Sequence, residues 1–196
     1  MADNIHPDFE RFISREKKEE ILGQRGSVLW LYGMSGSGKS TIATEVEKRL
    51  AAQGRFVVVL DGDNLRSGLN ADLGFTDEAR NENVRRTAEV AKIFASQGVI
   101  TLISVIAPLR RFREMAREIV GEDFKEIYIK ADFATCARRD PKGLYAKVSE
   151  GKVANFTGKD SGFEEPEKAE LILDTQKLSP EESAEKILSL ISELPK

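Results

Sequence analysis

The amino-acid sequence predicts a three-layer α/β domain in which helices cover both faces of a doubly wound, parallel sheet of five strands. The first observation is a set of five short apolar runs, at residues 28–32, 56–60, 99–106, 126–130 and 170–174. Their apolar residues are consecutive rather than alternating, which is typical of strands buried on both faces. The second observation is that helix-like stretches separate these runs. An alternation of strand and helix favours a parallel, doubly wound sheet.

The helix-like stretches lie at residues 40–53, 80–97, 108–120, 133–139 and 179–194. The last of them has the clearest start. Ser179 is a favourable N-cap, and Pro180 suits the first helical position. Glu181 and Glu182 follow where the helix dipole favours negative charge. In a domain of this kind, ligands bind beyond the carboxyl ends of the strands.

Two segments depart from the alternation. Residues 8–25 are dense in charge and predict a solvated amphipathic helix, with a partner-binding arm as the alternative. Residues 140–165 contain several glycines, have no long periodicity and are too long for an ordinary connection. We interpret residues 140–162, approximately, as a lid over a site. Because no repeat or linker divides the chain, residues 1–196 are expected to form a single domain.

Composition argues against several classes of function. The 33 acidic and 30 basic residues give a net charge of −3, which provides no general field to attract nucleic acid. One cysteine, Cys136, and one histidine, His6, provide neither a disulfide nor a zinc cluster. No apolar run approaches the roughly 20 residues that span a bilayer, and the first residues lack a signal pattern. We expect a cytoplasmic protein without nucleic-acid or membrane partners.

The segment GMSGSGKST, residues 33–41, has the spacing of a phosphate-binding loop. Gly33, Gly38, Lys39 and Ser40 occupy its defining positions. Successive backbone N–H groups and the positive end of the following helix favour phosphate, Lys39 can reach the β and γ phosphates, and Ser40 can ligate magnesium. A chance turn is the alternative. The apolar run before the loop and the helical pattern after it favour a cradle for a nucleoside triphosphate.

Two carboxylates follow the second apolar run directly. Asp61 and Asp63, in DGDNLR, are expected at the carboxyl end of a strand, close to the phosphate loop. They could organise magnesium and its waters, and one could accept a proton from an attacking hydroxyl. Asp-Gly and Asp-Asn are also common in turns. The position beside the phosphate loop favours the catalytic interpretation.

Basic residues gather in the next part of the chain. They are Arg66, Arg80, Arg85 and Arg86, accompanied by Asn83. Such a group could clamp a second, anionic substrate, because residues three apart on a helix share a face. For any one of these arginines, a surface salt bridge is an equal alternative.

Two phenylalanines, Phe75 and Phe156, stand in polar, glycine-bearing segments where a large ring would be exposed unless something covers it. As a pair they could stack on a base; the alternative is that they pack onto the core. The guanine-recognition and switch motifs of GTPases are missing from the sequence. A second substrate site is therefore better supported than a GTPase switch.

These segments together resemble one family, the adenylylsulfate kinases. The resemblance rests on GMSGSGKST, DGDNLRSGLNADLGF, RNENVRRTAEVA, RDPKGLYAK and FTGKDSGFEEP, and with GQRGSVLWLYG it covers residues 24–166. It implies a P-loop kinase fold with a lid. It also implies transfer of the γ-phosphoryl group of MgATP to the 3′-hydroxyl of adenosine 5′-phosphosulfate (APS), which gives 3′-phosphoadenylyl sulfate and ADP and activates sulfate.

The resemblance also implies roles for individual residues. Catalysis would rest on Lys39, Asp61 and Asp63. ATP would be bound by Gly33, Ser35, Gly36, Ser37, Gly38, Lys39, Ser40, Thr41 and Arg139. APS would be bound by Asp63, Asn64, Arg66, Phe75, Arg80, Asn83, Ile106, Ala107, Lys142 and Phe156. Mg²⁺ would lie at Ser40 and Asp63, partly through water. A homodimer and an association with ATP sulfurylase are further expectations from the family.

The sequence departs from the family pattern at two positions. Family members often have a serine, sometimes considered a phospho-accepting residue, where this chain has Ala107. A phosphoserine cannot form there, so we expect direct transfer between the two bound substrates. The family's FTGID is FTGKD here, with Lys159 in place of an apolar residue. This change could alter lid closure or substrate preference.

Two alternative functions stay open at this point. A nucleoside monophosphate kinase or another small-molecule P-loop kinase would share the phosphate loop and the lid, but it would not need the APS-binding motifs. A nucleotide-binding regulatory module without turnover is the alternative outside the enzymes. The retention of Lys39, Ser40, Asp61 and Asp63 speaks against it.

Overall fold

The computed structural model describes residues 11–141, 143–149 and 162–192. Within these residues, five parallel strands form one sheet in the order β2-β3-β1-β4-β5. The strands are β1 (Ser27–Tyr32), β2 (Val57–Asp61), β3 (Ile100–Val105), β4 (Phe124–Lys130) and β5 (Leu171–Asp174). Every neighbouring pair is parallel. The predicted five-stranded parallel sheet is confirmed, with strand ends within two residues of those expected.

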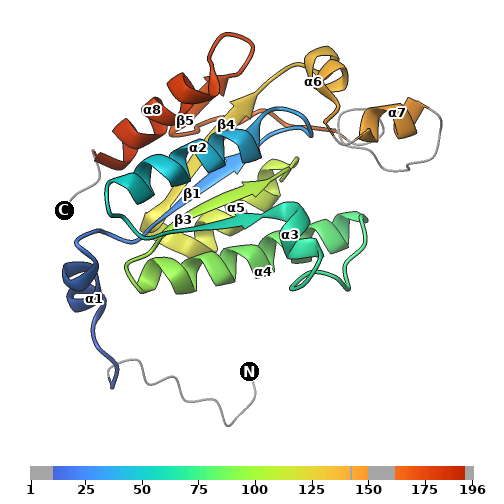
Figure 1. Ribbon diagram of the computed structural model, residues 1–196. Coiled ribbons are helices and arrows are strands. Elements are labelled where there is room, and N and C mark those ends of the chain that lie inside the picture. Colours follow the sequence, from blue (N-terminus) through green and yellow to red (C-terminus); the bar gives the residue numbers. More distant parts are fainter. Residues whose placement is uncertain (1–10, 142, 150–161, 193–196) are drawn as a thin grey trace, which may run out of the picture.

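Helices cover both faces of this sheet (Figure 1). The described helices are α1 (Arg15–Leu22), α2 (Lys39–Ala52), α3 (Gly62–Arg66), α4 (Asp77–Ser96), α5 (Arg110–Val120), the 3₁₀ turn η1 (Gly121–Asp123), α6 (Phe133–Arg139), α7 (Leu144–Ser149) and α8 (Pro180–Ser192). Helices α2 and α8 pack together on one face, and α4 and α5 pack together on the other. The three-layer, doubly wound architecture is therefore confirmed.

Alternate residues of the central strand β1 point into two separate apolar cores. Trp30 and Tyr32 pack on the side of α4 and α5, and Leu29 and Leu31 pack on the side of α2 and α8. All six residues of β1 are buried. A strand buried on both faces needs consecutive apolar residues, which is the pattern that identified it in the sequence.

Side-chain caps fix where several helices begin. The Ser179 hydroxyl accepts from the backbone N–H of Glu182, and the Glu182 carboxylate accepts in return from the N–H of Ser179. This capping box confirms the predicted start of α8. The Thr76 hydroxyl accepts from the N–H of Ala79, so α4 begins at Asp77 rather than at the expected residue 80. Helix α5 begins at Arg110, two residues later than expected.

The two atypical segments contain short helices. Helix α1 lies within residues 8–25 and has no buried residue, in agreement with the interpretation of a solvated helix. Helices α3 and α7 were not predicted, because neither is long enough to show a periodic pattern. Helix α7 lies within the expected lid at residues 140–162, whose residues 142 and 150–161 lie outside the described part of the chain. None of the helices described is long and apolar enough to cross a membrane.

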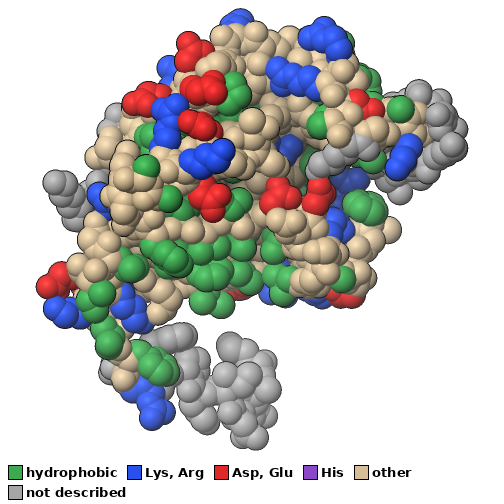
Figure 2. All heavy atoms as spheres, viewed as in Figure 1, with side chains coloured by type: hydrophobic (Ala, Val, Ile, Leu, Met, Phe, Trp, Pro, Cys, Tyr) green, Lys and Arg blue, Asp and Glu red, His purple; other side chains and the backbone are tan. Residues whose placement is uncertain are grey.

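One edge of the sheet leaves apolar residues accessible. Strand β2 is an edge strand of the sheet, and all five of its residues are half-buried. Figure 2 shows apolar side chains gathered over the region that β2 and α4 occupy in Figure 1. Phe56, before β2, and Ile93, on α4, are each more than half exposed. Exposed apolar surface of this kind is typical of contact sites.

Candidate active site

A cavity of about 940 Å³ opens beyond the carboxyl ends of β1, β2 and β3, the place expected for a ligand in a doubly wound sheet. Of the residues predicted for the site, it is lined by Ser35, Gly36, Gly38, Lys39, Ser40, Thr41, Asp61, Asp63, Arg66, Phe75, Arg80, Asn83, Ile106, Ala107 and Arg139. These residues come from segments far apart in the sequence. The structure therefore brings most of the predicted nucleotide-binding and substrate-binding residues around one space.

The phosphate loop connects β1 to α2 and requires glycine at three places. Gly36 and Gly38 have φ angles of 78° and 105°, which residues with a side chain rarely adopt. A Cβ atom at Gly36 would also lie 2.9 Å from the carbonyl oxygen of Cys136, and one at Gly33 would lie 2.4 Å from that of Ile129. The glycines thus let the loop close over the sheet, with the N-terminus of α2 pointing into the cavity.

Lys39, the first residue of α2, folds back over this loop. Its ammonium group donates to the carbonyl oxygens of Gly33 and Met34, at 2.9 and 2.7 Å. The residue is 8% exposed and lines the cavity. A positive charge is therefore held at the loop, where the phosphates of a nucleotide would lie.

Ser40 connects the phosphate loop to the second strand. Its hydroxyl donates to Asp61 Oδ2 at 2.7 Å and lies 3.1 Å from the Ser104 hydroxyl. Asp61 is the last residue of β2, and Ser104 belongs to β3. Ser104 was not predicted for the site; its sequence signal is only a hydroxyl within an apolar strand.

Asp61 has a second role, which is structural. Its Oδ1 accepts from the backbone N–H of Asp63 at 3.0 Å, and it is the N-cap of α3. Asp61 therefore caps a turn, as the turn interpretation expected, and it also lines the cavity; its catalytic role stays a prediction. Asp63, in the first turn of α3, also lines the cavity.

These oxygen ligands fit a magnesium ion. Mg²⁺ in nucleotide sites usually binds through one or two carboxylates together with phosphate oxygens and waters. Ser40, Asp61 and Asp63 provide a hydroxyl and two carboxylates beside the phosphate loop. Across the described residues, no group of three or more histidine, cysteine or acidic side chains could hold a metal by itself. The hydroxyl and the two carboxylates suit a metal that is also bound by phosphate oxygens.

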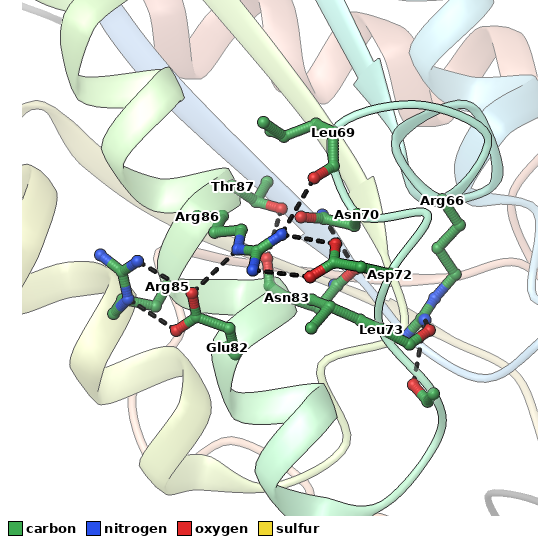
Figure 3. Close-up of polar contacts among 11 residues, drawn as sticks. Arg66, Leu69, Asn70, Asp72, Leu73, Glu82, Asn83, Arg85, Arg86 and Thr87 are labelled. Carbon is green, nitrogen blue, oxygen red and sulfur yellow. Dashed lines mark hydrogen bonds and ion pairs between the residues drawn. The ribbon is translucent and has the colours of Figure 1, made fainter.

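The other end of the cavity carries positive charge and an exposed ring. The Arg66 guanidinium donates to the carbonyl oxygen of Leu73 (Figure 3) and to that of Gly74. It also lies 4.4 Å from the centre of the Phe75 ring. Arg80 Nε donates to the Phe75 carbonyl oxygen at 3.0 Å. Phe75 is 61% exposed, so it does not pack onto the core. Its ring lies at the cavity wall with the Arg66 guanidinium over it, and its role in stacking on a base stays a prediction.

Burial lowers the pKa of Arg66 below its ordinary value, and the nearby charge of Arg80 lowers it further. Burial likewise lowers the pKa of Arg80. Both residues stay protonated at neutral pH, because the ordinary pKa of arginine is far above 7. Two partly desolvated positive charges at one end of a cavity favour an anionic ligand.

The arginines of α4 divide into two groups. Arg80 lines the cavity. Asn83, three residues later on the helix, also lines it and is 7% exposed. Arg85 and Arg86 instead form ion pairs with Glu82, and Arg86 forms a further pair with Asp72 (Figure 3). Neither of them lines the cavity. The idea that all four arginines form one anion clamp is therefore wrong for Arg85 and Arg86, for which the salt-bridge alternative holds.

Arg139, at the end of α6, lies at the phosphate-loop end of the cavity. Its guanidinium donates to the hydroxyl and the carbonyl oxygen of Thr175, at 3.0 and 2.7 Å. The Thr175 hydroxyl in turn donates to the Ser37 carbonyl oxygen at 2.9 Å. Thr175 lines the cavity although the sequence did not predict it, because its only signal is a position one residue after the fifth strand.

Ala107 lies where β3 leaves the sheet, in a backbone conformation unusual for alanine. Its φ angle is 38°, and its carbonyl oxygen accepts from Arg113 Nη1 at 2.9 Å. Arg113 is 2% exposed, pairs with Glu126 at 3.1 Å and also donates to the Glu164 carbonyl oxygen. This buried arginine was not singled out by its sequence position. It holds the segment that carries Ile106 and Ala107 against the rest of the cavity wall.

Some predicted residues do not line the cavity. Gly33 and Ser37 are buried beneath it and shape the phosphate loop from below. Asn64 is exposed in α3, outside the lining. Lys142 and Phe156, like Lys159, lie outside the described residues. Residues of the lining that were not predicted include Gly62, Val84, Val105, Pro108, Phe112, Pro141, Leu144, Leu178 and Pro180.

Comparisons with known proteins agree with this geometry. The family model described as adenylylsulphate kinase matches residues 25–174. The adenylyl-sulfate kinase of Phocaeicola vulgatus is 52% identical over 190 residues, which are 96% of this chain and 93% of that protein. The phosphate loop, the DGDN strand end and the cavity-lining residues up to Leu144 are all within residues 25–174, whereas Thr175, Leu178 and Pro180 of the lining follow them.

Solved structures of the same family have the same fold. The Mycobacterium tuberculosis APS kinase in complex with AMPPNP and APS superposes with a TM-score of 0.84 at 43% identity, covering 87% of this chain and 99% of that one. The hexameric APS kinase from Thiobacillus denitrificans has a TM-score of 0.66 at 30% identity, covering 86% of this chain and 29% of that longer one. Because the family model matches residues 25–174 and the Phocaeicola vulgatus enzyme is 52% identical over 96% of this chain, the chain belongs to the adenylylsulphate kinase family.

Proposed function

We propose that the chain is an adenylyl-sulfate kinase, which transfers the γ-phosphoryl group of ATP to the 3′-hydroxyl of APS. The products are 3′-phosphoadenylyl sulfate and ADP. The observation that carries the proposal is one continuous cavity, which joins the phosphate loop at one end to Arg66, Phe75, Arg80 and Asn83 at the other. A phosphoryl donor and an anionic, ring-bearing acceptor fit its two ends.

ATP would bind with its phosphates in the loop of residues 33–41. The backbone N–H groups of the loop and the N-terminus of α2 would receive the phosphate oxygens. Lys39 would exchange its bonds to two loop carbonyls for bonds to the β and γ phosphates. Arg139, held by Thr175, would lie at the nucleotide end of the cavity.

Magnesium fits the oxygen ligands beside the loop. Ser40 and Asp63 would hold it, partly through water, with Asp61 in contact with the Ser40 hydroxyl. When bound, the ion would neutralise charge that develops on the transferred phosphoryl group.

APS would occupy the end of the cavity lined by the two arginines. Arg66 and Arg80 would neutralise its phosphate and sulfate oxygens, and the exposed Phe75 ring would stack on its adenine. Lys142, Phe156 and Asn64 are part of the same proposal from the family motifs, with Phe156 as the second stacking ring. Asp63 would accept or orient the proton of the 3′-hydroxyl.

Positioning and charge neutralisation would supply most of the acceleration, as in other phosphoryl transfers. The position that carries a serine in many family members is Ala107, which has no hydroxyl to phosphorylate. Transfer would therefore proceed directly from ATP to APS, without an intermediate on the protein. Closure of a lid, at about residues 140–162, would exclude water and limit hydrolysis of ATP.

The remaining expectations belong to the same proposal. Residues 1–196 would act as one domain in the cytoplasm. The chain would form a homodimer, and the half-buried edge strand β2 with the exposed Phe56 and Ile93 offers apolar surface for such a contact. An association with an ATP sulfurylase, which makes APS, is also proposed.

An assay of ADP release tests the function. The purified protein is given ATP and Mg²⁺ with APS, with AMP, or with no acceptor, and ADP is measured by an enzyme-coupled reaction. Rapid release with APS alone supports the proposal. Rapid release with AMP would indicate a nucleoside monophosphate kinase, and ATP binding without release in any mixture would indicate a regulatory module.

A further inference from the structure

Asn70 and Asn83 face each other across the join between two elements at the proposed APS end of the cavity (Figure 3). Asn70 belongs to the turn after α3 and is fully buried, at 0% exposure. Asn83 belongs to α4 and is 7% exposed. Asn83 lines the cavity, whereas Asn70 does not. The buried residue therefore contacts a cavity residue from behind.

The hydrogen bond between them has a direction. Asn70 Nδ2 donates to Asn83 Oδ1 at 3.0 Å, within the buried interior. A carboxamide carries its acceptor oxygen and its donor NH₂ on opposite sides of one planar group. Because the Asn83 oxygen is turned toward the buried Asn70, its NH₂ lies on the other side of the group, and this is the part of Asn83 that we expect to donate to the cavity. The cavity wall at this end therefore carries a neutral donor beside the cationic donors Arg66 and Arg80.

Neighbouring contacts hold the backbones in this relationship. The Asn70 backbone N–H donates to the Leu65 carbonyl oxygen at 2.8 Å, and the Thr87 hydroxyl donates to the Asn83 carbonyl oxygen at 2.7 Å. On the outer side, Arg86 bridges α4 to the same turn through Asp72 and the Leu69 carbonyl oxygen (Figure 3). The ion pair of this outer bridge is exposed, and exposed ion pairs contribute little to the free energy of unfolding. The buried amide pair is the contact that fixes the Asn83 side chain.

Asn70 also carries a polar atom that the fold leaves unsatisfied. Its Oδ1 is buried and has no hydrogen-bond partner among the residues that the structure describes. A buried oxygen without a partner destabilises a fold, and an apolar residue in this turn would avoid that cost. Stability alone does not explain an asparagine at this position. The hydrogen bond that Asn70 Nδ2 donates to Asn83 does explain it.

We propose that Asn70 is a positioning residue that holds the Asn83 amide as a hydrogen-bond donor toward anionic oxygens of the acceptor substrate. The inference rests on the proposed function, because it takes APS as the ligand at this end of the cavity. Asn70 does not touch the substrate and acts through Asn83 alone. It therefore contributes to recognition of APS and not to binding of ATP.

Steady-state kinetics with both substrates varied test this role. We expect Asn70→Ala to raise the KM for APS about tenfold, equivalent to about 1.4 kcal/mol, while the KM for ATP stays within twofold. Asn70→Asp should raise it further, because a carboxylate only accepts and would draw the Asn83 NH₂ away from the cavity. Asn81→Ala, at an exposed position of the same helix, is the matched control and should change neither constant. Equal changes in both KM values for Asn70→Ala would overturn the proposal.

A double-mutant cycle separates positioning from general loosening. Because Asn70 acts through Asn83, Asn70→Ala should have little further effect on the KM for APS in an Asn83→Ala background. Independent, multiplicative effects of the two changes would contradict the proposal. Asn70→Ser, a smaller change that shortens the donor, replaces Asn70→Ala if thermal unfolding shows that the alanine variant does not fold.

The donor character of the Asn83 amide is tested without changing Asn70. Asn83→Asp replaces the donor by a carboxylate of the same shape and should raise the KM for APS at least tenfold; an unchanged value would show that Asn83 presents no donor to the acceptor. If the wild-type protein releases no ADP with APS, the proposed function is wrong. If the wild type is active on APS but the Asn70 variants change the KM for APS and the KM for ATP equally, only the positioning role is wrong.

Discussion

The Ser40 hydroxyl donates to Asp61 Oδ2 across 2.7 Å, which joins the phosphate loop to the end of the second strand. Ser40 belongs to α2, which follows β1, and Asp61 ends β2; the sheet order places β3 between β1 and β2. Ser104, on that intervening strand, completes the contact at 3.1 Å from the Ser40 hydroxyl. The ends of β2 and β3 thus meet the start of α2 at the hydroxyl that we propose as a magnesium ligand.

Ser40→Ala should therefore change the dependence on magnesium. Removal of the hydroxyl takes away one proposed ligand, and we expect the Mg²⁺ concentration for half-maximal activity to rise about 10- to 100-fold. Titration of activity with Mg²⁺ at saturating ATP and APS measures the change. Ser40→Thr keeps a hydroxyl and should recover most of the loss; a threonine variant as impaired as the alanine variant would argue against a ligand role.

Lys39→Ala should lower the turnover number about 100- to 1000-fold, because it removes a positive charge aimed at the transferred group. Steady-state assays give the turnover number, and circular dichroism establishes that the fold is retained. Lys48→Ala removes an exposed lysine from the same helix and is the control. Similar turnover numbers for the two variants would refute the role of Lys39.

Phe75→Ala should weaken binding of APS much more than binding of ATP. Base stacking on an aromatic ring contributes about 1 to 3 kcal/mol, so we expect the dissociation constant for APS to rise about 5- to 150-fold. Isothermal titration calorimetry with each nucleotide measures both affinities. Phe56→Ala removes a similarly exposed ring, before β2, and should leave both unchanged. Equal losses for APS and ATP in Phe75→Ala would contradict the stacking role.

Arg113→Leu should destabilise the protein strongly. Arg113 is 2% exposed, and its removal would leave Glu126 short of a buried partner and the Ala107 carbonyl oxygen without its donor. Loss of one member of a buried ion pair costs about 3 to 5 kcal/mol in the free energy of unfolding. Urea denaturation measures this loss.

The matched control for that loss lies two residues earlier on α5. Arg111 forms an exposed ion pair with Asp77, and such pairs contribute about 0 to 1 kcal/mol. Arg111→Leu should therefore leave the free energy of unfolding nearly unchanged. Comparable losses in the two variants would mean that burial of Arg113 does not determine its contribution.

The pair of arginines next to Glu82 predicts a pH dependence. Hydrogen bonds from Arg85 and Arg86 lower the pKa of Glu82 from 4.5 to about 2. Because the folded-state pKa is the lower one, the stabilisation is complete above pH 4.5 and is lost as the pH falls toward 2. Thermal unfolding between pH 2.5 and 6 should show a shallower decline for Glu82→Gln than for the wild type. Glu118→Gln, at an exposed site of α5, should follow the wild type.

Much of the fold was predictable because it depends on local sequence patterns. Consecutive apolar residues identified the five strands, and the Ser179 capping box located the start of α8. The start of α4 was placed too late, because the N-cap signal of Thr76 is a single hydroxyl before a polar first turn. Helices α3 and α7 are too short to show periodicity, and tertiary contacts decide whether such segments become helical.

The site was predictable where a motif encodes its chemistry, as in the phosphate loop and at Asp61 and Asp63. Thr175, Ser104 and Arg113 were not, because they come near the cavity only through strand order and packing. The arginines show the limit most clearly. Arg80 and Arg86 lie on one helix with the same chemistry, yet one lines the cavity and the other pairs with Asp72. The two side chains point in different directions from the helix, and the turn after α3 supplies the Asp72 partner of Arg86.

The order of the strands has a consequence for how the protein is made on the ribosome. Strand β1, which leads into the phosphate loop, lies between β3 and β4, and β4 ends at Lys130. Until the nascent chain reaches this length, β1 lacks a neighbour on at least one side, even when the whole loop motif has been synthesised. Pairing between distant segments is slow because long loops must close first. Affinity for ATP should therefore arise late in synthesis, only after about two thirds of the polypeptide has been translated.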